Sequence, residues 1–137
     1  MQIDTSELVE QLTRAGVGTH RAGFDPKRRQ VWIQFSSSED ATTLLNLMAR
    51  YIPEGEDLHR RIFGGGREPR AWQYSVAPVN QSREEIAAVP DELNWRPPTR
   101  YSFVLYSLFP PEDLPILIGL LRDYNGSLDQ RTPPAPL

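Results

Sequence analysis

The pattern of hydrophobic and polar positions predicts four strands, at residues 17–24, 30–36, 71–77 and 101–108. Residues 30–36 show the clearest alternation, because Val31, Ile33 and Phe35 would all point to one face of a sheet. Residues 101–108 are apolar on both faces, so this strand and residues 30–36 are the most apolar of the four. The other two stretches alternate more weakly. We therefore expect the two stronger strands to lie at the centre of a sheet.

Helical spacing of hydrophobic residues appears in three further stretches. The first predicts a helix over residues 5–15. The second follows Ser37, which is a good N-cap with an acidic residue three positions on, and ends near Tyr51. The third begins at Pro111, a residue that suits the first position of a helix, and we expect it to end at Asn125–Gly126.

Two parts of the chain resemble each other. Residues 39–51 align without a gap with residues 112–124, and both segments begin with Glu-Asp and end with Tyr. Residues 32–36 align with residues 103–107 if the second strand–helix connection is two residues longer. We interpret residues 17–51 and 71–125 as two ββα units. The other interpretation is that any two amphipathic strand–helix pairs share this binary pattern.

Two joined ββα units predict one α+β domain over residues 1–126, with a four-stranded antiparallel sheet and the helices on one face. This arrangement resembles a circularly permuted ferredoxin-like sandwich. The two weaker strands would be the edges. The N-terminal helix is an addition that would cover the open sheet face or an edge. The proline-rich residues 127–137 predict a disordered tail.

Composition narrows the classes of function. The chain has no cysteine, which excludes disulfides, thiol chemistry and cysteine zinc sites. Together with the absence of a signal-peptide pattern at the N-terminus, this leads us to expect a cytoplasmic protein. No apolar run approaches the roughly 20 residues of a membrane span, so no membrane partner is expected. The net charge of −3 argues against nucleic acid as a partner.

No group of residues indicates a reaction. His20 and His59 are the only histidines, and neither has a second histidine at metal-binding spacing. The Gly-x-Ser-x-Gly pattern of a hydrolase is absent. We therefore predict no catalytic residue, metal or cofactor, and we expect a protein that is not an enzyme. An enzyme or RNA-processing protein that works through the arginines near Gly64 stays open as an alternative.

The best indication of function is the length of two connections, residues 52–70 and 79–100, since connections this long usually carry function or are disordered. Aromatic and arginine side chains are enriched in binding hot spots, and four such residues lie on or beside the second connection: Trp72, Trp95, Arg96 and Arg100. We predict that a protein partner binds through residues 52–70 and 79–100 and the exposed edge of the sheet, and pairing of two copies through the sheet is a further option. Alternatively, the tryptophans anchor the connection onto the sheet.

The first connection contains a candidate anion site. Consecutive glycines let backbone N–H groups converge on an anion, and nearby arginines add positive charge. The residues concerned are Arg61, Gly64, Gly65, Gly66, Arg67 and Arg70. They predict, as the second functional hypothesis, a sensor of an anionic metabolite or nucleotide. No Gly-Lys-Ser/Thr completes a P-loop, and the plain alternative is a loop tip with solvated arginines.

Overall fold

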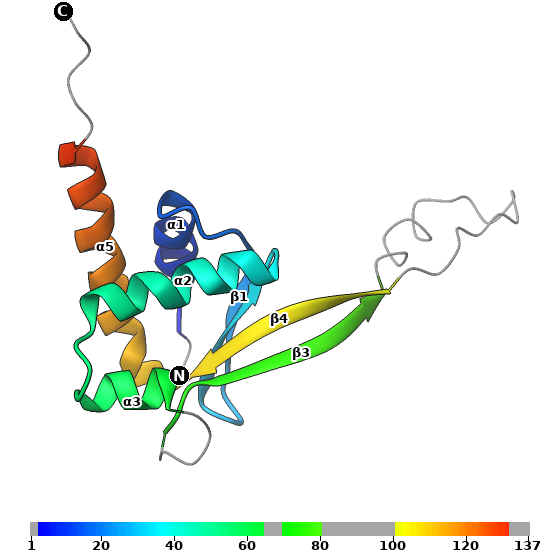
Figure 1. The fold of residues 1–137 in the computed structure, drawn as a ribbon. Helices are drawn as coiled ribbons and strands as arrows, with labels where there is room; N and C mark the ends of the chain where they lie inside the picture. The colour runs from blue at the N-terminus through cyan, green and yellow to red at the C-terminus, as the bar shows by residue number, and fades with distance from the viewer. Residues whose placement is uncertain (1–2, 65–69, 81–100, 132–137) are drawn as a thin grey trace, which may run out of the picture.

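The chain folds as an α+β domain in the computed structural model, which describes residues 3–64, 70–80 and 101–131 (Figure 1). The elements in chain order are α1 (Ser6–Arg14), β1 (Thr19–Asp25), β2 (Gln30–Phe35), α2 (Ser38–Tyr51), α3 (Asp57–Phe63), β3 (Gln73–Asn80), β4 (Tyr101–Phe109), a 3₁₀ turn η2 (Pro111–Asp113) and α5 (Leu114–Arg131). The α+β class expected from the sequence is confirmed.

The four strands form one antiparallel sheet in the order β1-β2-β4-β3. β2 and β4 are therefore the central strands, as the hydrophobic pattern predicts. They pair directly, with Ile33 opposite Ser107 and Val31 opposite Phe109. This pairing joins the first half of the chain to the second, so the sheet is complete only when both halves are present.

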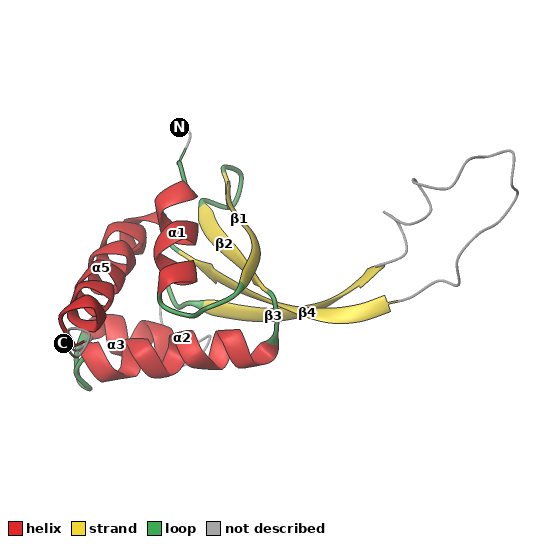
Figure 2. Ribbon diagram, turned by 90° about the horizontal axis from the view of Figure 1, so that it is seen from above, coloured by secondary structure: helices red, strands yellow, loops and turns green. Residues whose placement is uncertain are grey.

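The helices of the described residues cover one face of the sheet (Figure 2). Along β2, Val31, Ile33 and Phe35 point toward them and are buried. Trp32 points to the opposite face, where its ring meets that of Tyr106 edge-on, with the centroids 6.4 Å apart. One cluster joins the buried apolar side chains of this core: Leu8, Leu12, Ala15, Val17, Val31, Ile33, Phe35, Ala41, Leu44, Leu47, Met48, Ile52, Ile62, Trp72, Phe109, Leu114, Leu117 and Leu121.

The N-terminal helix α1 lies beside the edge strand β1 and packs against α5. The hydroxyl of Thr5 donates to the carbonyl oxygen of Ala22 in β1, at 3.3 Å. The amide of Asn125 in α5 donates to the backbone and side-chain oxygens of Gln11, at 3.1 and 2.8 Å. The sequence predicts that α1 covers either the open face of the sheet or an edge. In the structure α1 lies at the edge formed by β1, on the side of the sheet where the other helices pack.

The last helix is longer than predicted. α5 continues through Asn125 and Gly126 to Arg131, so the predicted end is wrong and residues 127–131 are helical. Asn125 is buried and its amide binds Gln11, so this side chain links two helices and does not end one. Gly126 has no left-handed φ, which the predicted helix stop would have required. Residues 132–137 of the predicted tail lie outside the described residues.

The helices of the two predicted ββα units match well in burial. Three aligned pairs are buried in both: Ala41 and Leu114, Leu44 and Leu117, Met48 and Leu121. The residue alignment of the strands is wrong by one position. Ile33 faces the helices, whereas its aligned residue Val104 shares the open face with Tyr106. When a strand is apolar on both faces, its sequence does not show which side chains point toward the core. An alignment that is wrong by one residue therefore places every side chain on the wrong face of the sheet.

Candidate functional site

A buried ion pair joins the first connection to the start of the last helix. Two guanidinium nitrogens of Arg61 in α3 donate to the two carboxylate oxygens of Asp113 in η2, one at 3.0 Å and the other closer. Arg61 is 8% exposed and Asp113 is 2% exposed. The Nε of Arg61 also donates to Asp57, at 2.8 Å. Chiefly because of its bonds to Asp113, and despite its desolvation, the pKa of Arg61 is raised above its ordinary value.

The sequence predicts that Arg61 binds an external anion, but in the structure it binds Asp113. The anion that its guanidinium binds is Asp113 of the same chain, so the side chain is not free for an external ligand. No local signal in the sequence pairs these two residues, because they are 52 positions apart. Asp113 belongs to a Glu-Asp pair at a helix start, where an acidic residue is expected for the helix dipole alone.

Trp72 is an anchor of the core. Its indole N–H donates to Asp113 at 3.0 Å, and its ring stacks on Phe109 with the centroids 4.3 Å apart. The side chain is 3% exposed, so a partner cannot reach it in this conformation. The structure thus places Trp72 in the anchoring role that the sequence left as an alternative. Trp95, Arg96 and Arg100, the other predicted partner-binding residues, lie outside the described residues.

The predicted glycine loop is described only at its two ends. Gly64 follows α3, and its N–H donates to the carbonyl oxygen of Arg60 at 2.7 Å. A Cβ at this position would clash with that same oxygen, so a glycine is required by the helix end itself. Gly65, Gly66 and Arg67 lie outside the described residues. Arg70, at the far end, is 57% exposed in its side chain and pairs with Glu112 at 2.9 Å.

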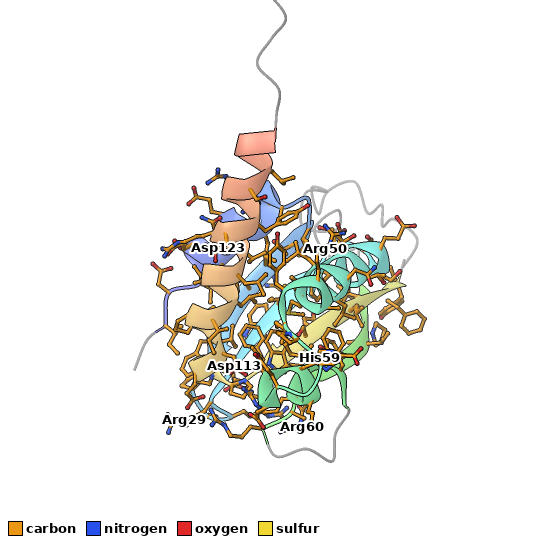
Figure 3. The ribbon with its side chains drawn as sticks, turned by 60° about the vertical axis from the view of Figure 1, so that its left-hand side comes forward. Arg29, Arg50, His59, Arg60, Asp113 and Asp123 are labelled. Atoms are coloured by element: carbon orange, nitrogen blue, oxygen red, sulfur yellow. The ribbon has the colours of Figure 1, made fainter. Side chains whose placement is uncertain are left out.

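Arg70 lines a groove of about 320 Å³ that we call the arginine groove. Its lining residues come from the β1–β2 turn, the start of β3 and the end of β4: Arg28, Arg29, Gln30, Arg70, Ala71, Gln73, Pro110, Pro111 and Glu112. Figure 3 shows Arg29 at the same end of the molecule as Arg60, with Asp113 further inside. Arg28 and Arg29 are functional candidates that sequence reasoning missed, because they belong to an ordinary hairpin turn.

At the opposite end of the same hairpin, β3 and β4 extend beyond the helices (Figures 1 and 2). We call residues 76–80 and 101–105 the arm. Among its side chains, Val76 is 62% exposed, Tyr101 is 65% exposed and Phe103 is 78% exposed. A second groove, of about 230 Å³, lies where the arm meets the start of α2. Its lining comprises Phe35, Ser36, Ser37, Ser38, Val76, Phe103, Val104 and Leu105.

Comparison with protein family models, with curated protein sequences and with solved structures gives no match. Within residues 3–64, 70–80 and 101–131, no cluster of histidine and acidic side chains could hold a metal ion. No helix of this part of the chain has the length and apolar character needed to cross a membrane. Within these residues, the arm presents exposed apolar side chains and the arginine groove gathers positive charge.

Proposed function

We propose that this protein is a non-enzymatic interaction domain that binds a protein partner through the arm. The observation that carries the proposal is the exposure of Val76, Tyr101 and Phe103 on two projecting strands without any charged residue. The sequence predicts a partner bound by residues 52–70 and 79–100. We now propose that the partner binds β3 and β4, the strands on either side of the second connection. The lack of cysteine is our reason for assigning this role to the cytoplasm.

The absence of charge on the arm is unusual for this chain. Charged residues make up 24% of the sequence, yet none occurs in the eight residues of β3 or the nine of β4. β3 is an edge strand, and natural proteins commonly protect such edges with charged side chains. The centres of protein interfaces are depleted of charge and enriched in aromatic residues. The composition of the arm is therefore that of an interface centre.

The direction of the side chains indicates how a partner would sit. Val76 is opposite Leu105 in the sheet, and Phe103 is opposite Pro78. Residues directly opposite share a face, and Leu105 is on the face that the helices cover nearer the body. A partner that covers Val76 and Phe103 would thus continue the helical layer over the arm. We infer that the partner offers an uncharged apolar surface, part of which enters the groove beside Ser36.

Edge-to-edge pairing of two copies is less favoured by the same strands. Pro78 lies within β3 and has no backbone N–H, and proline in a strand is found where its nitrogen faces away from the ladder. The outer edge of β3 therefore lacks a donor at this position. We accordingly propose a different protein as the partner, with contact through the face of the arm.

Affinity capture from cells that produce the protein naturally tests the proposal, using the wild type, Phe103→Ser and Phe63→Ser. Phe63 is a matched control, because it is also exposed, at 38%, but lies on α3 away from the arm. We expect a protein retained by the wild type and by Phe63→Ser and lost from Phe103→Ser. Capture of the same proteins by all three would refute the proposal. Sedimentation equilibrium that shows a dimer broken by Phe103→Ser would make a second copy the partner.

We further propose that the fold is a permuted ferredoxin-like sandwich built from two ββα units. Support comes from the matched burial of α2 and α5 and from the contact between their aligned tyrosines, Tyr51 and Tyr124, whose ring centroids are 6.2 Å apart. Residues related by a twofold axis meet where they lie near that axis. An experimental structure tests this, since rotation of β1-β2-α2 onto β3-β4-α5 must superpose the two units without reordering the strands.

A further inference from the structure

The arginine groove brings together three guanidinium groups from separate parts of the chain. Arg28 and Arg29 follow β1, whereas Arg70 precedes β3. Gln30 and Gln73 add amide groups to the lining, and Pro110 and Pro111 form an apolar wall. The groove is at the end of the β3–β4 hairpin remote from the arm, so it is independent of the proposed partner site.

The charge of the groove is opposite to that of the whole protein. Three arginines against one glutamate leave the lining with a formal charge of +2, while the chain carries −3. Arg70 is paired with Glu112 at 2.9 Å. Among the described residues, the guanidinium groups of Arg28 and Arg29 are in no ion pair. Within the described residues, neither group has to leave an ion pair before it binds an external anion.

The backbone gives a second and independent indication. Arg29 and Arg70 have φ angles of 54° and 59°, and they are the only non-glycine residues with positive φ in the described part of the chain. This conformation costs an L-residue free energy, whereas glycine adopts it freely. The turns thus require the backbone conformation but not the arginine side chain. Residues kept in such conformations cluster at functional sites.

We propose that the arginine groove binds a phosphate group, carried either by free phosphate or by a phosphate monoester of a small molecule. A phosphate dianion balances the formal charge of the lining, and the planar arginine fork matches phosphate oxygens in bidentate geometry. A groove of about 320 Å³ is larger than one phosphate, which leaves room for an organic group. Tight binding of a nucleic acid would need more phosphate contacts than three arginines supply.

Glu112 allows a substitution that should strengthen phosphate binding, in addition to the arginine substitutions that should weaken it. Its carboxylate competes with the ligand for Arg70 and repels an anion in the groove. The hydrogen bond from its own backbone, with Arg70 and Arg29 nearby, outweighs desolvation and holds the pKa of Glu112 below its ordinary value, so the group stays charged near neutral pH. Removing this charge should therefore strengthen binding, while removing an arginine should weaken it.

Calorimetric titration at low salt with inorganic phosphate, and separately with a hexose phosphate, tests the site. We expect roughly millimolar affinity for phosphate, as for a ligand of few atoms, and tighter binding of the monoester. Arg29→Gly and Arg70→Gly should each weaken binding roughly tenfold. Glu112→Gln should tighten it by roughly two- to fivefold, the range of an exposed charge interaction. The control Arg50→Gln, which removes an exposed charge on α2 remote from the groove, should change nothing (Figure 3).

The glycine variants also separate binding from folding. Because glycine suits the left-handed backbone at both positions, Tm should stay the same or rise by about 3 °C in Arg29→Gly and Arg70→Gly while affinity falls. Phe103→Ser should leave phosphate binding intact, which separates this site from the arm. No binding of either ligand to the wild type, equal affinity in Arg50→Gln and Arg70→Gly, or binding of an oligonucleotide alone would overturn the proposal.

Discussion

Side chains alternate between the two faces in the same way at both ends of the β3–β4 hairpin, but one end is buried under the helices and the other is exposed. At the end nearer the helices, Phe109 is completely buried and Ser107 nearly so. Two and four residues earlier on the same face of β4, Leu105 is half-buried and Phe103 is 78% exposed. The pattern of the strand does not change between these positions. What changes is the cover, because the helices pack over the first end, whereas only the start of α2, at Ser38, borders the other.

This difference shows that burial is decided by the neighbouring elements and not by the strand pattern. The covered end is further held by Arg61, Asp113 and Trp72, which join α3, η2 and the start of β3. The phenol of Tyr74 donates to the carbonyl oxygen of Ile62 in α3, at 3.1 Å, and burial raises its pKa. In the arm, by contrast, Val76, Tyr101 and Phe103 are exposed. One end of the hairpin thus stabilises the fold, and the other presents apolar side chains at the surface.

The largest expected effect is at the covered end. Asp113→Ala removes the carboxylate that pairs with Arg61 and accepts from Trp72, leaving a buried cation without its main partner. We expect a loss of about 4–5 kcal/mol in the free energy of unfolding, measured by urea denaturation. Glu112→Ala is the matched control, because its ion pair with Arg70 is exposed and its loss should lower the free energy of unfolding far less. Similar losses in both variants would contradict a special role for the buried pair.

A direct comparison of the two ends uses the same substitution twice on β4. Phe109→Ala removes a ring that is fully buried and stacked on Trp72, and should lower the free energy of unfolding by about 3–4 kcal/mol. Phe103→Ala removes an exposed ring and should change it by less than about 0.5 kcal/mol. Urea denaturation of both variants measures the difference. If Phe103→Ala proves as costly as Phe109→Ala, the arm is part of the core in solution.

A smaller effect is expected at the boundary between the two ends, where α2 begins. The Ser37 hydroxyl donates to Asp40 at 2.7 Å, and the N–H of Gly18 donates to the same carboxylate at 2.7 Å. The bond from Ser37, followed by that from Gly18, lowers the pKa of Asp40 from its ordinary value of 3.8. Asp40→Asn should cost about 1 kcal/mol at pH 7. The exposed Glu39 in the same turn provides the control, Glu39→Gln, which should cost little.

The sign of the pH dependence follows from the lowered pKa. A carboxyl group with a lower pKa in the folded state stabilises the protein fully above its unfolded pKa, and this contribution is lost as the pH falls through the folded value. The difference in unfolding free energy between the wild type and Asp40→Asn should therefore be constant from about pH 5 to 8 and shrink below about pH 4. A difference that persists unchanged to pH 2 would mean that the charge of Asp40 is not what stabilises this helix start.

Local patterns in the sequence predicted much of the fold. The alternation of Val31, Ile33 and Phe35 identified a central strand, and Ser37 identified the start of α2. Features that depend on distant contacts were missed or misplaced. The sequence predicts a helix stop at Asn125 because its partner Gln11 lies 114 positions away. The predicted alignment of residues 32–36 with residues 103–107 is one residue out of register.

The same distinction between local patterns and distant contacts applies to the candidate sites. The neighbouring glycines indicate Arg70 as an anion-binding candidate. Nothing in the sequence indicates Arg28 and Arg29, because only the folded chain brings the β1–β2 turn beside the start of β3. The sequence predicts an external anion for Arg61 because the charge of Arg61 is evident in the sequence, whereas its pairing with Asp113 is not. The sequence does not indicate the exposure of the arm, because this exposure depends on where the helices pack in the folded chain.

The hydrogen bonds between Asn125 and Gln11 have a consequence for the order in which the domain forms. They hold the first helix against the last one, while the central pairing of β2 with β4 also spans much of the chain. During synthesis on the ribosome, α1, β1, β2 and α2 emerge long before the segment that completes their core. Leu8 and Leu12 lack part of their cover until α5 leaves the exit tunnel, so the nascent chain exposes this apolar surface up to that point.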